Sequence, residues 1–222
     1  MSYFLSNQAM NRVKMLLIFT LFNSLIGYAS NKSSLNPPLE NLKNDPHAAH
    51  KASVKKLGYK IKKVNYQIPN LTLINSLGEE VDFLKLVNSD QPIVLNFIFT
   101  TCTTICPVMT ATFSNMNNKL GKESAKIKLI SITIDPEYDR PKVLKEYSKL
   151  FNAGPDWIFL TGNENDIYQV ANSFDAFFGS KMNHQPLTLL KNPNDEFWYR
   201  IEGLATGTDL AKEIKNRLLN LK

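Results

Sequence analysis

Cysteine is scarce in this 222-residue sequence, which contains only Cys102 and Cys106. Two cysteines exclude both a small disulfide-scaffold protein and a zinc site built from four cysteines. A basic stripe interleaved with aromatic residues is also missing, because the 26 Lys and Arg residues are scattered along the chain. Nucleic-acid binding is therefore not expected. With 43% hydrophobic residues the chain can bury one ordinary core, so we expect one domain.

The amino-terminal apolar run, residues 15–26, is shorter than the roughly 20 residues that a membrane-spanning helix needs. Gly27 and Ala29 then place small residues where a signal peptidase cleaves. We therefore expect residues 1–29 to be a signal peptide, with an uncleaved anchor as the alternative. No cysteine lies nearby, so a lipid-modified amino terminus is not expected. Both alternatives imply an exported protein, periplasmic or on the outer face of the inner membrane.

Residues 30–63 are polar, rich in Lys and Asn, and without apolar periodicity, which is typical of a flexible tether. His47 and His50 lie in this segment at a spacing that could bind a metal ion in one helical turn. We favour the interpretation that they are ordinary solvated histidines. The folded domain is expected to occupy residues 64–222.

The pattern of residues 64–222 predicts a thioredoxin-like α/β fold, in which a central mixed sheet has helices on both faces. An amino-terminal hairpin is expected first, and a nearly continuous apolar run indicates a strand buried on both faces. The expected strands are 71–74, 81–83, 93–99, 127–134, 157–160, 187–190 and 197–201, and the expected helices are 107–120, 143–151, 167–174 and 210–218.

Cys102 and Cys106 follow the buried strand 93–99, where Pro107 marks the first turn of a helix. The carboxyl end of a strand is where open α/β sheets bind ligands, and a helix amino terminus favours thiolate over thiol. A four-residue step brings both sulfurs to one side, and a Cα separation of about 6 Å permits a disulfide. The pair is therefore either a metal clamp or a redox couple.

Three residues between the cysteines leave room for an ion, and two thiolates select Cu(I) or Zn(II). A third ligand is needed, and His184 is the candidate, because its loop precedes strand 187–190 and faces the cysteine-bearing turn in such a sheet. Met109 lies on the apolar stripe of a helix and is expected in the core. Met182 remains an open candidate ligand.

Asp135 and Asp139 follow the second buried strand. Asp135 is expected either to orient the metal site from behind its ligands or only to start a turn. For Asp139 we favour a local structural role near the amino terminus of the next helix.

The chain resembles the SCO/SenC copper proteins that assist cytochrome c oxidase assembly. The resemblance depends on NFIFTTCTTICPVMT at 96–110, SITIDPEYDRP at 131–141, and His184. It implies a thioredoxin-like fold that binds one copper ion, Cu(I) or Cu(II), through Cys102, Cys106 and His184. It further implies delivery of copper to the binuclear centre of the oxidase, or reduction of the thiols of that centre.

The implied protein is a metallochaperone rather than a catalyst. Its expected partners are the copper-bearing oxidase subunit, a periplasmic copper donor and an exported thiol reductant. The reductant is needed because a Cys102–Cys106 disulfide offers no thiolate to copper. The alternative is an exported thiol-disulfide oxidoreductase in which the cysteines cycle and His184 is incidental. A peroxiredoxin is disfavoured, because Phe99 stands where its Pro-x3-Thr/Ser-x2-Cys motif needs another residue.

Overall fold

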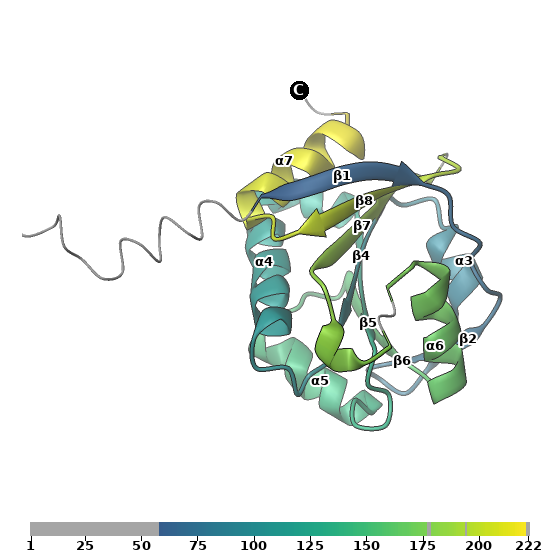
Figure 1. Ribbon diagram of the computed structural model, residues 1–222. Coiled ribbons are helices and arrows are strands. Elements are labelled where there is room, and N and C mark those ends of the chain that lie inside the picture. Colours follow the sequence, from purple (N-terminus) through teal and green to yellow (C-terminus); the bar gives the residue numbers. More distant parts are fainter. Residues whose placement is uncertain (1–57, 177–178, 194, 221–222) are drawn as a thin grey trace, which may run out of the picture. The chain divides into compact units, whose positions relative to one another are not determined.

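An eight-stranded mixed sheet forms the centre of the domain (Figure 1). The computed structural model describes residues 58–176, 179–193 and 195–220. The strand order is β1-β8-β7-β4-β5-β6-β2-β3. The four inner strands are β4 (Ile93–Ile98), β5 (Lys128–Thr133), β6 (Trp157–Thr161) and β7 (Leu187–Lys191). Strands β4, β5 and β6 are parallel, whereas β7 runs antiparallel to β4, so the sheet is mixed as predicted.

Two hairpins complete the inner sheet. Strands β2 (Thr72–Asn75) and β3 (Glu80–Asp82) form the expected amino-terminal hairpin, which joins the main sheet through β6. Strand β8 (Trp198–Gly203) pairs antiparallel with β7, which confirms the second hairpin.

Strand β1 (Tyr59–Val64) was not expected, because the polar composition of residues 30–63 predicted a tether up to residue 63. It pairs antiparallel with β8 along six residues and forms an edge of the sheet. Tyr59 and Ile61 are partly buried against the core, whereas the lysines between and after them are exposed. Backbone pairing and one half-buried face thus order a segment whose lysine content alone suggested a tether.

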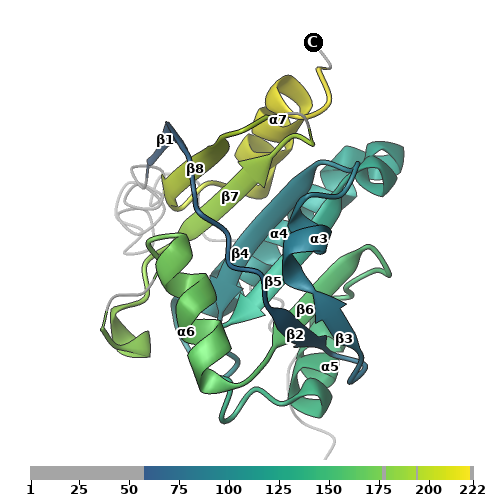
Figure 2. The same ribbon diagram turned by 90° about the vertical axis from the view of Figure 1, so that its right-hand side faces the viewer.

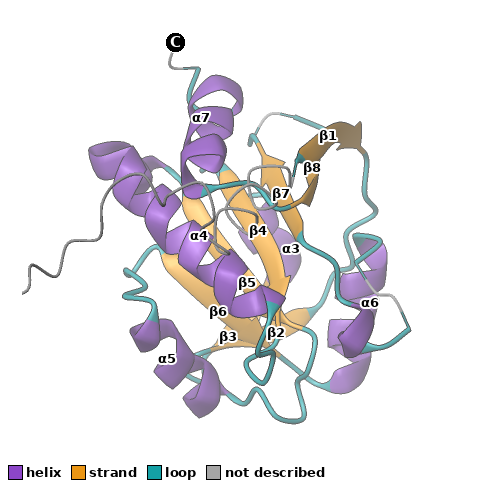
Figure 3. Ribbon diagram, turned by 60° about the vertical axis from the view of Figure 1, so that its left-hand side comes forward, coloured by secondary structure: helices purple, strands orange, loops and turns teal. Residues whose placement is uncertain are grey.

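Helices cover both faces of the sheet (Figures 2 and 3). One face packs against α4 (Ile105–Leu120), α5 (Pro141–Leu150) and α7 (Gly207–Arg217), and the other against α3 (Phe83–Val87) and α6 (Glu164–Ser173). Two 3₁₀ helices, η2 (Gly121–Lys126) and η3 (Lys181–Asn183), lie in the connections. This is a thioredoxin-like arrangement, and α3 is the one α-helix of the described residues that the sequence did not indicate.

The topology brings three loops to one edge of the sheet. The parallel strands β4 and β5 both end there, and β7 begins there because it is antiparallel to β4, with Asn96 opposite Thr188. These loops carry the cysteines, the two aspartates and His184 respectively. Ligand sites in open α/β sheets form at this edge.

Three expectations concern the amino-terminal part of the chain. The signal peptide, the tether up to residue 57, and His47 with His50 all lie outside the described residues. Within the described ranges, no helix has the length and apolar character to cross a bilayer.

Candidate functional site

The two cysteines lie together at the start of α4. The helix begins at Ile105, so Cys106 is in its first turn and Cys102 is in the loop before it. The backbone N–H of Cys106 donates to the Sγ of Cys102 at 3.4 Å, and the hydroxyl of Thr104 lies 3.7 Å from the same sulfur. Both cysteines are free thiols in this structure. The expected thiol pair at a helix amino terminus is present, and its four-residue spacing brings Cys102 Sγ onto the first helical turn.

The two thiols differ in acidity. Burial opposes ionisation of Cys102, but hydrogen bonds from the backbone of Cys106 and from Thr104 outweigh it and lower its pKa to about 7. Burial raises the pKa of Cys106 far above its ordinary value, and the neighbouring Cys102 adds to this. Cys102 keeps 8% of its surface exposed and Cys106 keeps none. At neutral pH Cys102 is thus the reactive, partly ionised thiol and Cys106 its protonated, buried partner.

Asp139 anchors the cysteine-bearing loop. Its carboxylate is fully buried and accepts hydrogen bonds from the backbone N–H of Thr100 at 3.0 Å, from the hydroxyl of Thr100, and from the hydroxyl of Thr133 at 2.6 Å. The expected structural role is present, but its local character is wrong, because the side chain reaches a loop 39 residues away. Burial raises the pKa of Asp139, although the bonds from Thr100 and Thr133 act in the opposite direction.

Asp135 touches both of the other loops at the site. Its backbone N–H donates to Thr133 Oγ1 at 2.9 Å, and its carboxylate forms an ion pair with Lys181 Nζ at 2.6 Å. The hydroxyl of Thr101, in the cysteine-bearing loop, lies 3.5 Å from the same carboxylate oxygen. This position suits a residue that orients the site from behind its ligands.

His184 is buried, with 8% of its surface exposed, although it belongs to a loop. It caps the carboxyl end of η3, and its ring lies edge-on to Phe99 with centroids 6.4 Å apart. Neither ring nitrogen has a hydrogen-bond partner among the described residues. Burial lowers the pKa of His184, with a smaller opposing effect from the nearby backbone of Phe97, so the ring is neutral at physiological pH. A neutral imidazole is the form that ligates a metal ion.

The donor set fits a soft metal ion. Two free thiols lie at one helix amino terminus, with the Cys106 N–H bonded to Cys102 Sγ. The buried His184 has two ring nitrogens without hydrogen-bond partners among the described residues, which is an unusual state for buried polar atoms. Among the described residues, however, no three His, Cys, Asp or Glu side chains lie close enough together to hold an ion. The structure therefore places Cys102 and Cys106 together and His184 beside Phe99, with no ligating triad formed.

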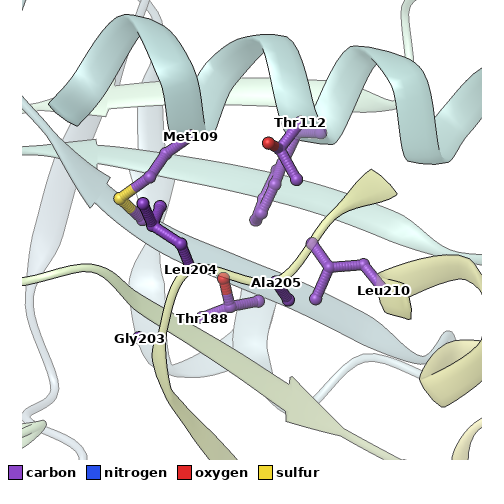
Figure 4. Close-up of a pocket in the computed structure, with 8 residues that line it drawn as sticks. Met109, Thr112, Thr188, Gly203, Leu204, Ala205 and Leu210 are labelled. Atoms are coloured by element: carbon purple, nitrogen blue, oxygen red, sulfur yellow. The ribbon is translucent and has the colours of Figure 1, made fainter. Parts of the chain in front are cut away.

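The two methionines near the proposed ligands differ in burial, and Met109 is buried as the sequence predicted. That side chain is 4% exposed and lines a small pocket with Leu204 and Leu210 from the β8–α7 region, so it belongs to the core (Figure 4). Met182 is 78% exposed in η3, and its role as a ligand stays a prediction.

A buried hydrogen-bond link between α4 and α5 was not apparent from the sequence. The hydroxyl of Thr110 donates to the carbonyl of Cys106 at 2.9 Å and lies 2.9 Å from the hydroxyl of Tyr147 on α5. It ties the first turn of α4 to its neighbouring helix. Periodicity places Tyr147 on a buried helix face but carries no signal for its partner.

Comparison with known proteins gives the family. The sequence profile described as SCO1/SenC matches residues 63–219. The SCO1 protein homolog of Bacillus subtilis is 37% identical over 116 residues, which cover 51% of this chain and 59% of that protein. The chain thus aligns with little more than half the length of this relative.

Solved structures agree with the fold. BsSco, a member of the Sco family of cytochrome c oxidase assembly proteins with a disulfide switch, superposes with a TM-score of 0.58 at 30% identity. That match covers 70% of this chain and 95% of BsSco. Copper-bound ScoI of Bradyrhizobium japonicum gives a TM-score of 0.56 at 24% identity over 68% of this chain and all of that one, and supports the fold alone. Because the family profile matches residues 63–219, which is more than half of the chain and reaches from the end of strand β1 through helix α7, the chain belongs to the SCO1/SenC family.

Proposed function

We propose that this protein binds one copper ion and acts as an assembly factor for cytochrome c oxidase. In this proposal it delivers copper to the binuclear copper centre or reduces the thiols of that centre. The observation that carries the proposal is the pair of free thiols at the start of α4, with the Cys106 N–H directed at Cys102 Sγ. The choice of copper follows the family membership, and two solved structures with the same fold, each 24% identical to this chain, have copper bound.

Each residue has a distinct role in copper binding. Cys102, with its pKa near 7, offers a thiolate at little cost, whereas Cys106 must lose a proton when an ion arrives. His184 needs no deprotonation, because its pKa is already lowered, and it supplies a nitrogen donor when its ring turns from Phe99 toward the sulfurs. The bound ion is cargo: two thiolates hold Cu(I), and the additional nitrogen suits Cu(II).

The second candidate function, thiol-disulfide exchange, is favoured by the split in thiol acidity. Cys102 thiolate would attack a partner disulfide and form a mixed disulfide, releasing one partner thiolate. Cys106, after losing its proton, would then displace the second partner sulfur and form a Cys102–Cys106 disulfide. The partner gains two electrons and leaves with two thiols, and an exported thiol reductant must later reduce this protein.

Copper titration of the reduced protein under anaerobic conditions tests the first candidate. We expect uptake near one Cu(I) per chain, and slower thiol loss to a mild oxidant once one equivalent is bound, since bound copper favours the dithiol form by mass action. Equal rates of thiol loss with and without copper would show that copper does not engage the pair. They would shift the assignment to the oxidoreductase.

The proposed partners follow from these roles. They are the copper-bearing subunit of the oxidase, a copper donor and the thiol reductant. The proposed location is exported, in the periplasm or on the outer face of the inner membrane, with residues 1–29 as signal peptide or anchor.

A further inference from the structure

The loop that carries His184 is attached to the rest of the site through Lys181. Lys181 opens η3, and its carbonyl accepts the backbone N–H of His184 at 3.2 Å. Its Nζ forms the 2.6 Å ion pair with Asp135 and lies 5.9 Å from the ring centroid of Phe99. The same residue thus contacts His184 through its backbone and the aspartate loop through its side chain.

The Asp135 end of this link is fixed. The carboxylate is 9% exposed, the backbone N–H is bonded to Thr133 at the end of β5, and the next turn begins on the carbonyl of Asp135, which accepts the N–H of Tyr138 and Asp139. A well-buried carboxylate interacts with a lysine more strongly than a fully exposed one does, because water screens the pair less. The 41% exposed lysine is therefore the adjustable end.

We propose that Lys181 is a positioning residue for His184: its ion pair with Asp135 sets where the imidazole lies against Phe99 and, through that, its approach to the cysteines. The consequence for copper depends on the proposed function, whereas the consequence for the ring position does not. Loss of the ion pair leaves η3, a helix of three residues, with its Ser180 cap and local bonds, so the loop should shift without unfolding the domain.

The test compares Lys181→Met with Lys181→Arg, which keeps the charge. Lys126→Met is the control, because Lys126 forms an ion pair of the same 2.6 Å length with Glu123 in η2, which precedes the start of β5, whereas the site lies at the end of that strand. Nuclear Overhauser contacts between the rings of His184 and Phe99 are measured in the copper-free reduced protein. We expect them to be lost or strongly weakened in Lys181→Met and kept in Lys181→Arg and Lys126→Met.

A copper measurement on the same variants separates the two proposals. We expect Lys181→Met to weaken Cu(II) binding about 5-fold, the range of a partly exposed ion pair, and to leave Cu(I) binding within about 2-fold. Asp135→Asn should reproduce the loss of ring contacts, and the double variant should be no worse than either single one. Ring contacts that persist unchanged in both Lys181→Met and Asp135→Asn would overturn the inference. If the contacts are lost as expected but the wild-type protein takes up no copper, Lys181 positions His184 and the proposed copper function fails.

Discussion

The cysteine-bearing loop and the histidine-bearing loop meet at one edge of the sheet but are held in different ways. The first is tied to the core by the fully buried Asp139 and continues directly into α4. The second is held by a half-exposed lysine and by the packing of His184 on Phe99. The thiols are therefore built into the fold, whereas the histidine position can be adjusted. In the proposed copper site, the rigid cysteine-bearing loop supplies both donors for Cu(I), and the histidine-bearing loop supplies the additional donor for Cu(II).

The largest expected effect comes from removing either thiol. Cys102→Ser or Cys106→Ser replaces one of two soft donors with a protonated hydroxyl, so Cu(I) affinity should fall by more than about 100-fold. Competition with a Cu(I) chelator measures this, and Ser124→Ala, on the exposed η2, is the control. Wild-type affinity in either cysteine variant would rule out a two-thiolate site.

The next largest effect is expected from changing Asp139, which anchors the cysteine-bearing loop. Three donors bond to the two carboxylate oxygens of Asp139. Asp139→Asn leaves only one acceptor oxygen and replaces the other with an amide NH₂ group, which is a donor. At least one buried donor loses its partner, so we expect the free energy of unfolding to fall by about 2 kcal/mol. Denaturant unfolding of the copper-free protein measures it, with Asp135→Asn as the comparison, for which less than about 1 kcal/mol is expected. Equal losses in the two variants would remove the contrast between the loops.

His184→Ala probes the adjustable part directly. Cu(II) affinity should fall about 10-fold, because a nitrogen donor is lost, whereas Cu(I) affinity should change little. In the copper-free protein the variant removes two unpartnered buried nitrogens, so we expect only a small change in stability. Cu(II) titration followed by electron paramagnetic resonance measures the first effect. An unchanged Cu(II) spectrum would exclude His184 as a ligand.

The smallest effect concerns the pH dependence of Cys102. Because its pKa is lowered to about 7, its thiolate fraction should rise only about 10-fold from pH 6 to pH 8, against about 75-fold for an ordinary thiol of pKa 8.5. The rate of first alkylation of the reduced protein follows this fraction, with a midpoint near pH 7. Cys102→Ser is the control and should react slowly throughout, since the pKa of Cys106 is raised. A midpoint near 8.5 would contradict the hydrogen-bonded thiolate.

The sequence predicted the elements that depend on hydrophobic pattern. Strands β4 and β5 are buried on both faces, and α4 has its apolar stripe, so their positions agree closely with expectation. Strand β1 was missed because its order comes from pairing with β8, about 140 residues further along the chain.

The cysteines were found because spacing and a helix start are local signals. The partner of Asp139 was not, because a contact between Thr100 and Asp139 depends on two parallel strands ending at the same edge. For the same reason Lys181 carried no signal, since its partner is 46 residues away. Sequence spacing thus identifies candidate ligands, and the topology supplies the residues that hold them.

The complete burial of Cys106 also bears on irreversible damage. A peroxide that reaches the site meets Cys102 first, because Cys106 is fully buried, and converts the Cys102 thiolate to a sulfenic acid. Cys106 contacts Cys102 Sγ through its backbone N–H, and its thiol can condense with the sulfenic acid to give a disulfide and water before a second peroxide arrives. The buried Cys106 thiol therefore favours a disulfide, which a thiol reductant can reduce, over the irreversible oxidation of Cys102.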